Sequence, residues 1–345
     1  MPSFHIGFPS PSIADLTMPE NAALAHLCEE HKFDTLWHSN ERFYREMFIR
    51  MTSSTLATKH IGIGGAVVEP FAVHPLLSAQ SIATLQELSG GRAALALGAG
   101  GSGFQMMGVQ RRKSAAALRE AYTVMGQLLA GDQVTFEGEV VRAYQARLQF
   151  TPPPHIQLWI ATRGDLTLET SGEYAEAIII ATYATPAGVG EALQLIEKGL
   201  ERSGRHIGDL RIMSRVDTCV HQDPQLAIEG TRTMVARFLW SSYPDCNFVT
   251  RAGLEVPKDI KELIAKRDNA LIPQIAARIP QEFTQTFCWA GEPAQVADRL
   301  IDIGHATGVR EFGFWVLLAP GQSREQATRL IAEEIVPRVR SALAD

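Results

Sequence analysis

The sequence predicts an α/β fold, a single parallel (β/α)8 barrel of the TIM type with insertions. Short apolar runs alternate with longer segments of helical period along the whole chain, and eight such pairs are present. Repeated strand–helix units indicate a parallel sheet with helices outside it, and eight units is the number that closes a barrel. The alternative is an open doubly wound sheet. It is disfavoured because FPSPS, after the first strand, is not a G-x-G-x-x-G fingerprint.

Four strand–helix pairs occupy the first part of the chain. The strands are the β-branched or apolar runs at residues 4–8, 34–39, 60–68 and 92–98. The helices are expected at residues 20–31, 42–58, 75–90 and 114–129. The third helix has the clearest ends, because Pro75 is a favoured first-turn residue and Gly90-Gly91 is a typical stop.

The second part of the chain interrupts this rhythm twice. Residues 134–150 alternate with period two around Glu137-Gly138, which predicts a hairpin insertion at about 133–150. Further strands are predicted at residues 155–161, 176–182, 209–220 and 311–318, each with a helix after it. Residues 241–290 fit the pattern poorly and predict a helical insertion of the kind that covers a mouth or contacts a partner. We therefore expect one domain over residues 1–345.

Composition excludes several classes of function. The net charge of -6 with interspersed signs argues against nucleic acid as the main partner. No apolar run is long enough for a membrane span, and the N-terminus does not resemble a signal peptide. Four scattered cysteines, without C-x-x-C pairs or histidines at zinc-finger spacing, indicate reduced thiols and no metal site. We therefore expect a soluble cytoplasmic protein.

A glycine-rich loop follows the fourth predicted strand, where a barrel of this type carries its site. It runs Gly98-Ala-Gly-Gly-Ser-Gly103, and five of its six residues are very small. Glycine allows a positive φ and lets backbone N–H groups approach a planar ring or an anionic group. A flexible turn is the alternative interpretation.

The segment LQELSGGRAALALGAGGSGF resembles the strand-four signature of the bacterial-luciferase-like superfamily. That superfamily contains flavin monooxygenases and deazaflavin-dependent reductases such as methylenetetrahydromethanopterin reductase. Further segments that resemble it are VVEPFAVHP, IQLWIATRGDLTLETSGEYAEAIII and GEPAQVADRLIDIG. The resemblance spans most of the chain outside residues 241–290. It implies a barrel that holds coenzyme F420 or FMN at the carboxyl ends of its strands.

The resemblance also assigns roles to individual residues. The third strand should end in a bulge with a cis peptide at Ala66-Val67, which backs the central ring of the cofactor. Gly98, Gly100 and Gly101 should approach the cofactor. Ala161 should contact the cofactor, and the cofactor phosphate should lie at Thr162-Arg163-Gly164, where a turn into a helix offers free N–H groups and Arg163 adds a charge. Thr182, after the sixth barrel strand, should line the same wall.

Two departures from the family pattern concern proton transfer. Members that use the deazaflavin often carry Asp-His after strand two, whereas this chain has Asn40-Glu41. Many also have an acid where Gly101 stands. Asn40 and Glu41 are therefore the candidate catalytic residues, with Glu41 as the carboxylate that could protonate or orient substrate. An ion pair of Glu41 with Arg42 or Arg45 is the competing interpretation.

These observations together predict an enzyme that transfers a hydride at N5 of a flavin or F420 to or from a small organic substrate. A first alternative is an FMN-dependent two-component monooxygenase that needs a separate flavin reductase. A second is a non-catalytic cofactor-binding or partner subunit. The family resemblance implies a homodimer.

Overall fold

The computed structural model describes residues 1–101, 103–244 and 246–344. Its main sheet has the strand order β10-β9-β11-β1-β2-β3-β4-β7-β8, and β9 also pairs with β8. The pairing of β9 with β8 closes the sheet, so the chain is the parallel (β/α)8 barrel predicted from the sequence. The fold divides into two compact units. The first comprises residues 4–181 and 192–213, and the second comprises residues 1–3, 182–191 and 214–345.

Six parallel strands form the sheet of the first unit. They are β1 (Ser3–Phe8), β2 (Thr35–Ser39), β3 (Gly62–Val68), β4 (Ala93–Leu97), β7 (Gln157–Thr162) and β8 (Ala177–Ala181). Ile6 pairs with Leu36, Leu36 with Ile63, and Ile63 with Ala93, so the strand ends lie at similar heights. Most of their side chains are buried, as expected for parallel strands covered on both faces.

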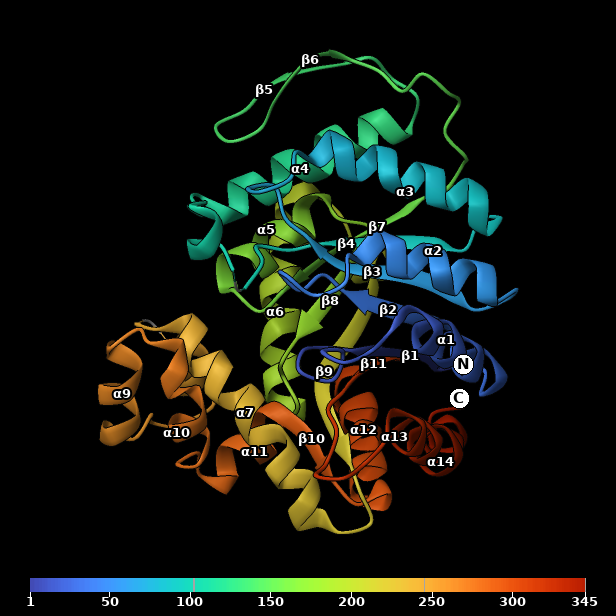
Figure 1. The fold of residues 1–345 in the computed structure, drawn as a ribbon. Helices are drawn as coiled ribbons and strands as arrows, with labels where there is room; N and C mark the ends of the chain where they lie inside the picture. The colour runs from blue at the N-terminus through green and yellow to red at the C-terminus, as the bar shows by residue number, and fades with distance from the viewer. Residues whose placement is uncertain (102, 245, 345) are drawn as a thin grey trace. The chain divides into compact units, whose positions relative to one another are not determined.

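The helices of this unit connect successive strands of the sheet (Figure 1). They are α1 (Met18–Glu30), α2 (Met47–Ala57), α3 (Pro75–Ser89), α4 (Ser114–Leu129), α5 (Asp165–Tyr174) and most of α6 (Pro186–Ser203). The predicted hairpin forms from β5 (Val134–Glu137) and β6 (Arg142–Ala146), which pair antiparallel. Residues 147–150, predicted as part of it, lie outside the strands.

Glycines in β3 make room for large side chains in the core beneath the strand ends. A Cβ atom at Gly64 would lie 2.5 Å from the Trp37 ring. Trp37 in turn packs edge-on against Trp159 of β7, with ring centroids 5.9 Å apart. Both indoles are at most 1% exposed, so they fix the spacing of β2, β3 and β7.

Two buried or half-buried carboxylates hold loops of this unit by accepting three successive backbone N–H groups. Glu29 of α1 accepts from residues 59, 60 and 61, at 2.5 to 3.0 Å. Glu120 of α4 accepts from residues 139, 140 and 141, at 2.7 to 2.9 Å, and so fastens the hairpin to α4. Burial is the largest single effect on these two carboxyl groups, and it raises the pKa of each. The N–H bonds together outweigh burial, so the pKa of both groups lies below its usual value.

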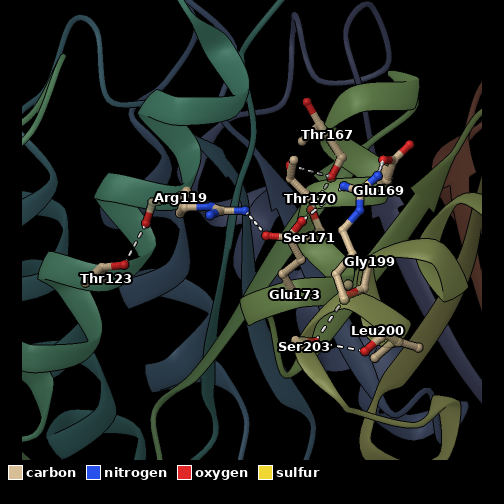
Figure 2. Close-up of polar contacts among 12 residues, drawn as sticks. Arg119, Thr123, Thr167, Glu169, Thr170, Ser171, Glu173, Gly199, Leu200 and Ser203 are labelled. Carbon is tan, nitrogen blue, oxygen red and sulfur yellow. Dashed lines mark hydrogen bonds and ion pairs between the residues drawn. The ribbon is translucent and has the colours of Figure 1, made fainter.

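Helices α5 and α6 pack closely through two glycines. A Cβ atom at Gly172 would overlap the Ile196 carbonyl oxygen, and one at Gly199 would overlap that of Glu169. Figure 2 shows Glu169 and Glu173 of α5 close to Gly199 of α6, with Arg119 of α4 reaching Glu173. Arg202 of α6 also pairs with both glutamates, so this packing carries an ion-pair network on its surface.

The second unit contains most of β9 (Arg211–Val220), together with β10 (Cys288–Gly291) and β11 (Glu311–Val316). Its helices are α7 (Pro224–Ser242), α8 (Asn247–Arg251), α9 (Lys258–Ala265), α10 (Ile272–Ala276), α11 (Gln281–Phe287), α12 (Pro293–Thr307), α13 (Arg324–Leu330) and α14 (Val336–Ala342). A π-helical turn, Ile331–Ile335, joins α13 to α14 just before Pro337.

Residues 241–290 differ from expectation in content. They form four short helices and strand β10, which the sequence did not predict. Phe248, in this segment, is a core residue. It is 8% exposed and packs on Phe287 with ring centroids 5.0 Å apart. The segment therefore has a hydrophobic core of its own with α7.

Helix α2 begins at Met47, five residues later than predicted. Phe43 has a φ of 64°, which a right-handed helix cannot contain. Glu46 then caps the helix by accepting a hydrogen bond from the Ile49 N–H at 2.8 Å. Residues 40–46 are thereby left as a loop after β2, at the edge of the sheet where the candidate site lies.

Candidate active site

Strand β3 ends in the geometry predicted for it. The Ala66-Val67 peptide bond is cis, and the pairing of β3 with β4 shifts register between Ala66 and Val68. Asn40, after β2, holds this strand end at two points. Its backbone N–H donates to the Ala66 carbonyl oxygen at 2.9 Å, and its side-chain Nδ2 donates to the Val67 carbonyl oxygen at 3.0 Å.

The glycine loop after β4 lies against the same strand end. The Gly98 N–H donates to the Val68 carbonyl oxygen at 2.9 Å. A Cβ atom at Gly98 would lie 3.0 Å from both Val67 methyl groups and from the Ala161 carbonyl oxygen. Glycine at position 98 therefore lets Val67 and Ala161 converge. These contacts bring together Asn40, Ala66, Val67, Gly98 and Ala161.

The remaining loop residues have different environments. Gly100 has a φ of 70°, and a Cβ atom there would meet the Phe104 ring at 2.8 Å. Gly101 is exposed, and a Cβ atom there would have no other atom within 4 Å. Ser102 lies outside the described residues. Gly100 thus fits a closely packed turn, whereas Gly101 has space for a ligand beside it.

An ion pair that the sequence did not suggest lies beside these residues. Arg42, in the loop after β2, pairs with Glu69, the residue that follows β3. Glu69 is 4% exposed and also accepts hydrogen bonds from the backbone N–H groups of Phe71 at 2.7 Å and Ala72 at 3.0 Å. Arg42 was considered as a partner for Glu41, and its ion pair is with Glu69 instead. The two residues are 27 positions apart, so spacing alone gave no signal for their contact.

Phe104 brings a second arginine to the glycine loop. The guanidinium carbons of Arg42 and Arg111 lie 5.6 Å and 5.5 Å from the centroid of its ring. Arg111 also donates from Nη1 to the Gly100 carbonyl oxygen at 2.9 Å. Cation–π contacts at Phe104 and a hydrogen bond at Gly100 thus restrain these two loop residues.

The turn into α5 has the features of an anion site. Thr162 Oγ1 accepts a hydrogen bond from the Gly164 N–H at 3.1 Å. Gly164 is the N-cap of α5 and has no side chain to bond the first N–H groups of the helix. Arg163 is half-buried in this turn, and Asp165 adds one carboxylate to the first helical turn. The main attraction for an anion there is therefore the backbone N–H groups and Arg163.

Thr182 follows β8 and belongs to the second compact unit. It is 3% exposed and has a φ of 77°, an uncommon value for a residue with a Cβ atom. Its N–H donates to the Arg215 carbonyl oxygen at 3.0 Å. Thr182 is thus held firmly within its own unit.

Three histidines, His5, His38 and His74, have surroundings that indicate structural roles. His38 is 1% exposed, with Nδ1 3.1 Å from the Gly64 carbonyl oxygen and Nε2 2.8 Å from Ser54 Oγ. Burial, together with the nearby positive charge of Arg50, lowers the pKa of His38 to about 3. His74 caps α3 by accepting a hydrogen bond from the Leu76 N–H. His5 is buried within β1.

Two negative findings apply to the described part of the chain. No group of three or more His, Cys, Asp or Glu side chains is placed to hold a metal ion. No described helix combines the length and apolar character needed to cross a membrane.

The comparisons with known proteins agree with this geometry. The 5,10-methylenetetrahydromethanopterin reductase of Archaeoglobus fulgidus is 27% identical, over 95% of this chain and 98% of its own length. The F420-dependent glucose-6-phosphate dehydrogenase of Nakamurella multipartita is 25% identical, over 93% of each chain. The structure of the coenzyme F420-dependent tetrahydromethanopterin reductase from Methanopyrus kandleri superposes with a TM-score of 0.83, at 26% identity, covering 98% of this chain and 99% of that one. The family model described as luciferase-like monooxygenase matches residues 4–311. The chain therefore belongs to the luciferase-like monooxygenase family.

Proposed function

We propose that the protein is an F420-dependent oxidoreductase that transfers a hydride to or from a small organic substrate. The structural observation that supports this proposal is the end of β3, where Asn40 donates hydrogen bonds to the carbonyl oxygens of Ala66 and Val67 beside a glycine loop. The choice of F420 over FMN follows the named relatives that match nearly the whole chain. When bound, the cofactor would carry the hydride, which consists of one proton and two electrons.

The position of transfer on the ring depends on the cofactor. Position 5 is nitrogen in a flavin but carbon in a deazaflavin, so transfer at N5, as expected from the sequence, applies to FMN alone. For F420 we propose transfer at C5. The work of the protein is to bind and orient the ring and to exclude water from it.

The residues present fit such a cofactor. Val67 packs tightly against Gly98 at the strand ends, and no atom lies within 4 Å of a Cβ position at Gly101. Thr162, Arg163 and Gly164 offer the chemistry needed to hold a phosphate, because the first N–H groups of α5 have no side-chain cap. We assign Ala66, Val67, Gly98, Gly100 and Gly101 to the ring, Ala161 to Gly164 to the phosphate, and Thr182 to the wall.

We propose Asn40 and Glu41 as the residues nearest the reacting groups. Asn40 commits its side-chain N–H to Val67, so its role is to orient the strand end that backs the ring. Glu41 is half-buried in the loop that follows and is the candidate for holding a proton or orienting substrate. The proposed substrate is a small organic molecule.

Two other functions have weaker support. An FMN-dependent monooxygenase with a separate flavin reductase fits the family match. A non-catalytic partner subunit is consistent with Asn40-Glu41, which replaces the Asp-His pair that family members using the deazaflavin often carry. We further propose one domain over residues 1–345 in a cytoplasmic protein, since its four cysteines are free thiols.

A homodimer is supported by an apolar surface on α2 and α3. Ile49 and Leu56 of α2 are 61% and 72% exposed, and their spacing of seven places them on one helix face. Leu77 and Leu88 of α3 are 58% and 49% exposed and are eleven residues apart, again on one face. Such a surface is costly to leave in water, and a second copy of the chain would cover it.

Separate titrations of the purified protein with F420 and with FMN test the proposed function. The expected result is micromolar binding of F420, followed by quenching of its fluorescence, with much weaker binding of FMN. Binding of FMN alone would replace the proposal with the monooxygenase alternative. Binding of neither would remove the cofactor-dependent functions altogether.

A further inference from the structure

Glu69 is a buried carboxylate at the centre of the candidate site. Its side chain is 1% exposed, yet it pairs with Arg42 and accepts two backbone N–H groups, from Phe71 and Ala72. A buried carboxylate without partners is strongly unfavourable, so these three donors are what keep it in place. With its oxygens engaged by three donors, the Glu69 carboxylate is held in one orientation and is suited to position the groups around it.

Arg42 connects this charge to the strand end that carries the cis peptide. Its Nη1 lies 3.4 Å from Asn40 Oδ1, and Asn40 Nδ2 donates to the Val67 carbonyl oxygen at 3.0 Å. The two ends of an amide differ, since the oxygen accepts and the nitrogen donates. A guanidinium beside the oxygen therefore favours the orientation in which the nitrogen of Asn40 faces Val67.

The same pair contacts the glycine loop. A Cβ atom at Gly103 would lie 2.5 Å from Arg42 Cγ, and one at Gly100 would lie 3.3 Å from Glu69 Cγ. The Arg42 guanidinium also faces the Phe104 ring from 5.6 Å. Arg42 and Glu69 thus touch the ends of β2 and β3 and the loop after β4, the three segments that carry Asn40, Val67 and Gly98.

We propose that Arg42 and Glu69 are a positioning pair, which holds the Asn40 amide and the glycine loop against Ala66-Val67 and thereby sets the surface that receives the cofactor ring. The inference rests on the proposed function. The pair lies next to Asn40-Glu41 and the glycine loop, the two segments in which this chain lacks the family's usual Asp-His and loop acid.

The test compares Glu69→Gln and Arg42→Met with the control Glu169→Gln, which removes an ion pair of Arg202 in α5 of the same unit. Loss of a hydrogen bond to a charged group predicts roughly tenfold weaker F420 binding for both site variants. The control should bind within about twofold of wild type, because partly exposed ion pairs contribute little. Arg42→Lys keeps the positive charge but lacks the planar guanidinium with its several N–H donors. It should therefore bind F420 more tightly than Arg42→Met and less tightly than wild type.

Two further measurements separate positioning from general destabilisation. The absorbance spectrum of bound F420 should differ between wild type and the site variants at saturating cofactor. Hydrogen exchange of the ligand-free protein should speed up at residues 71–72 and in the glycine loop, with helices α4 to α6 unchanged. Because Arg42 is partly exposed, Arg42→Met provides the decisive result if Glu69→Gln does not fold.

Wild-type affinity and an unchanged spectrum in a folded Arg42→Met protein would overturn the positioning role. If wild type binds neither F420 nor FMN, the proposed function fails. Exchange rates in the variants that equal those of wild type would separately refute the claim that the pair holds the loop.

Discussion

Gly199 of α6 lies directly against the carbonyl oxygen of Glu169 in α5, so closely that a Cβ atom at position 199 would overlap that oxygen (Figure 2). Backbone on both sides of this contact leaves no flexible side chain to move away. We expect Gly199→Ala to lower the free energy of unfolding by about 3 kcal/mol, because the two helices must separate. Urea denaturation monitored by circular dichroism measures this.

Gly190, on the same helix, is the matched control for that substitution. No atom lies within 4 Å of a Cβ position there. Gly190→Ala should raise stability by about 0.5 to 1 kcal/mol, since alanine is the better helix former. Equal effects of the two substitutions would show that helix propensity, rather than the contact with Glu169, governs position 199.

His38 should make stability depend on pH. Its pKa is about 3 in the fold, against an ordinary value of 6.5, because burial and Arg50 disfavour the charged ring. Between these two values the unfolded chain binds the additional proton. His38 therefore contributes stability fully above about pH 6.5 and loses it as the pH falls toward 3, with a slope of at most about 1.4 kcal/mol per pH unit.

The measurement for His38 is urea unfolding at several pH values between about 7.5 and 4.5, which covers most of the window between the two pKa values. His38→Gln should be less stable than wild type at neutral pH, because bonds to Gly64 and Ser54 are altered. Its stability should also fall less steeply as the pH is lowered. His26→Gln, on the exposed face of α1, should keep the wild-type slope. A slope shared by all three proteins would assign the pH dependence to other groups.

Arg163 is expected to distinguish the cofactor from its phosphate-free headgroup. Removing one cation from the turn before α5 should weaken F420 binding in Arg163→Met about tenfold, as for one charge-assisted hydrogen bond. Binding of the deazariboflavin headgroup, which lacks the phosphate, should change by less than about twofold. Fluorescence titration with both molecules provides the comparison, and an equal loss for both would move the phosphate away from this turn.

Leu56 tests the apolar surface of α2. If a second copy of the chain covers this surface, Leu56→Glu introduces a charge into a buried contact and should convert a dimer into a monomer. Leu166→Glu changes another exposed leucine, in α5, and should leave the assembly unaltered. Sedimentation velocity gives both masses, and a monomeric wild-type protein would contradict the proposed homodimer.

The barrel could be predicted from the sequence because its signals are local. Apolar runs, Pro75 at a helix start and Gly90-Gly91 at its end each act over a few positions, and the structure contains all of the predicted strands. Strand β10 was missed because four residues directly after a helix give too short a pattern. The start of α2 was misplaced because Phe43 adopts a positive φ, which no periodicity indicates.

The candidate site was only partly predictable for a related reason. The cis bond at Ala66-Val67 was predicted from the family resemblance and is confirmed. The contact between Arg42 and Glu69 depends on two strand ends that the fold brings together across 27 residues. Since no local pattern encodes a long-range ion pair, the nearest residue, Glu41, was considered instead as the partner of Arg42.

The carboxylates of Glu29 and Glu120 have one more consequence. Clusters of backbone amides are natural receptors for free phosphate or sulfate. In the loops at residues 59–61 and 139–141 those receptors are already filled by the protein's own side chains. The start of α5 lacks such an internal occupant from its cap residue, Gly164. A phosphorylated ligand would thus find fewer competing anion sites in this unit. The two loops occupied by glutamate carboxylates thereby increase the selectivity of the ligand for the start of α5.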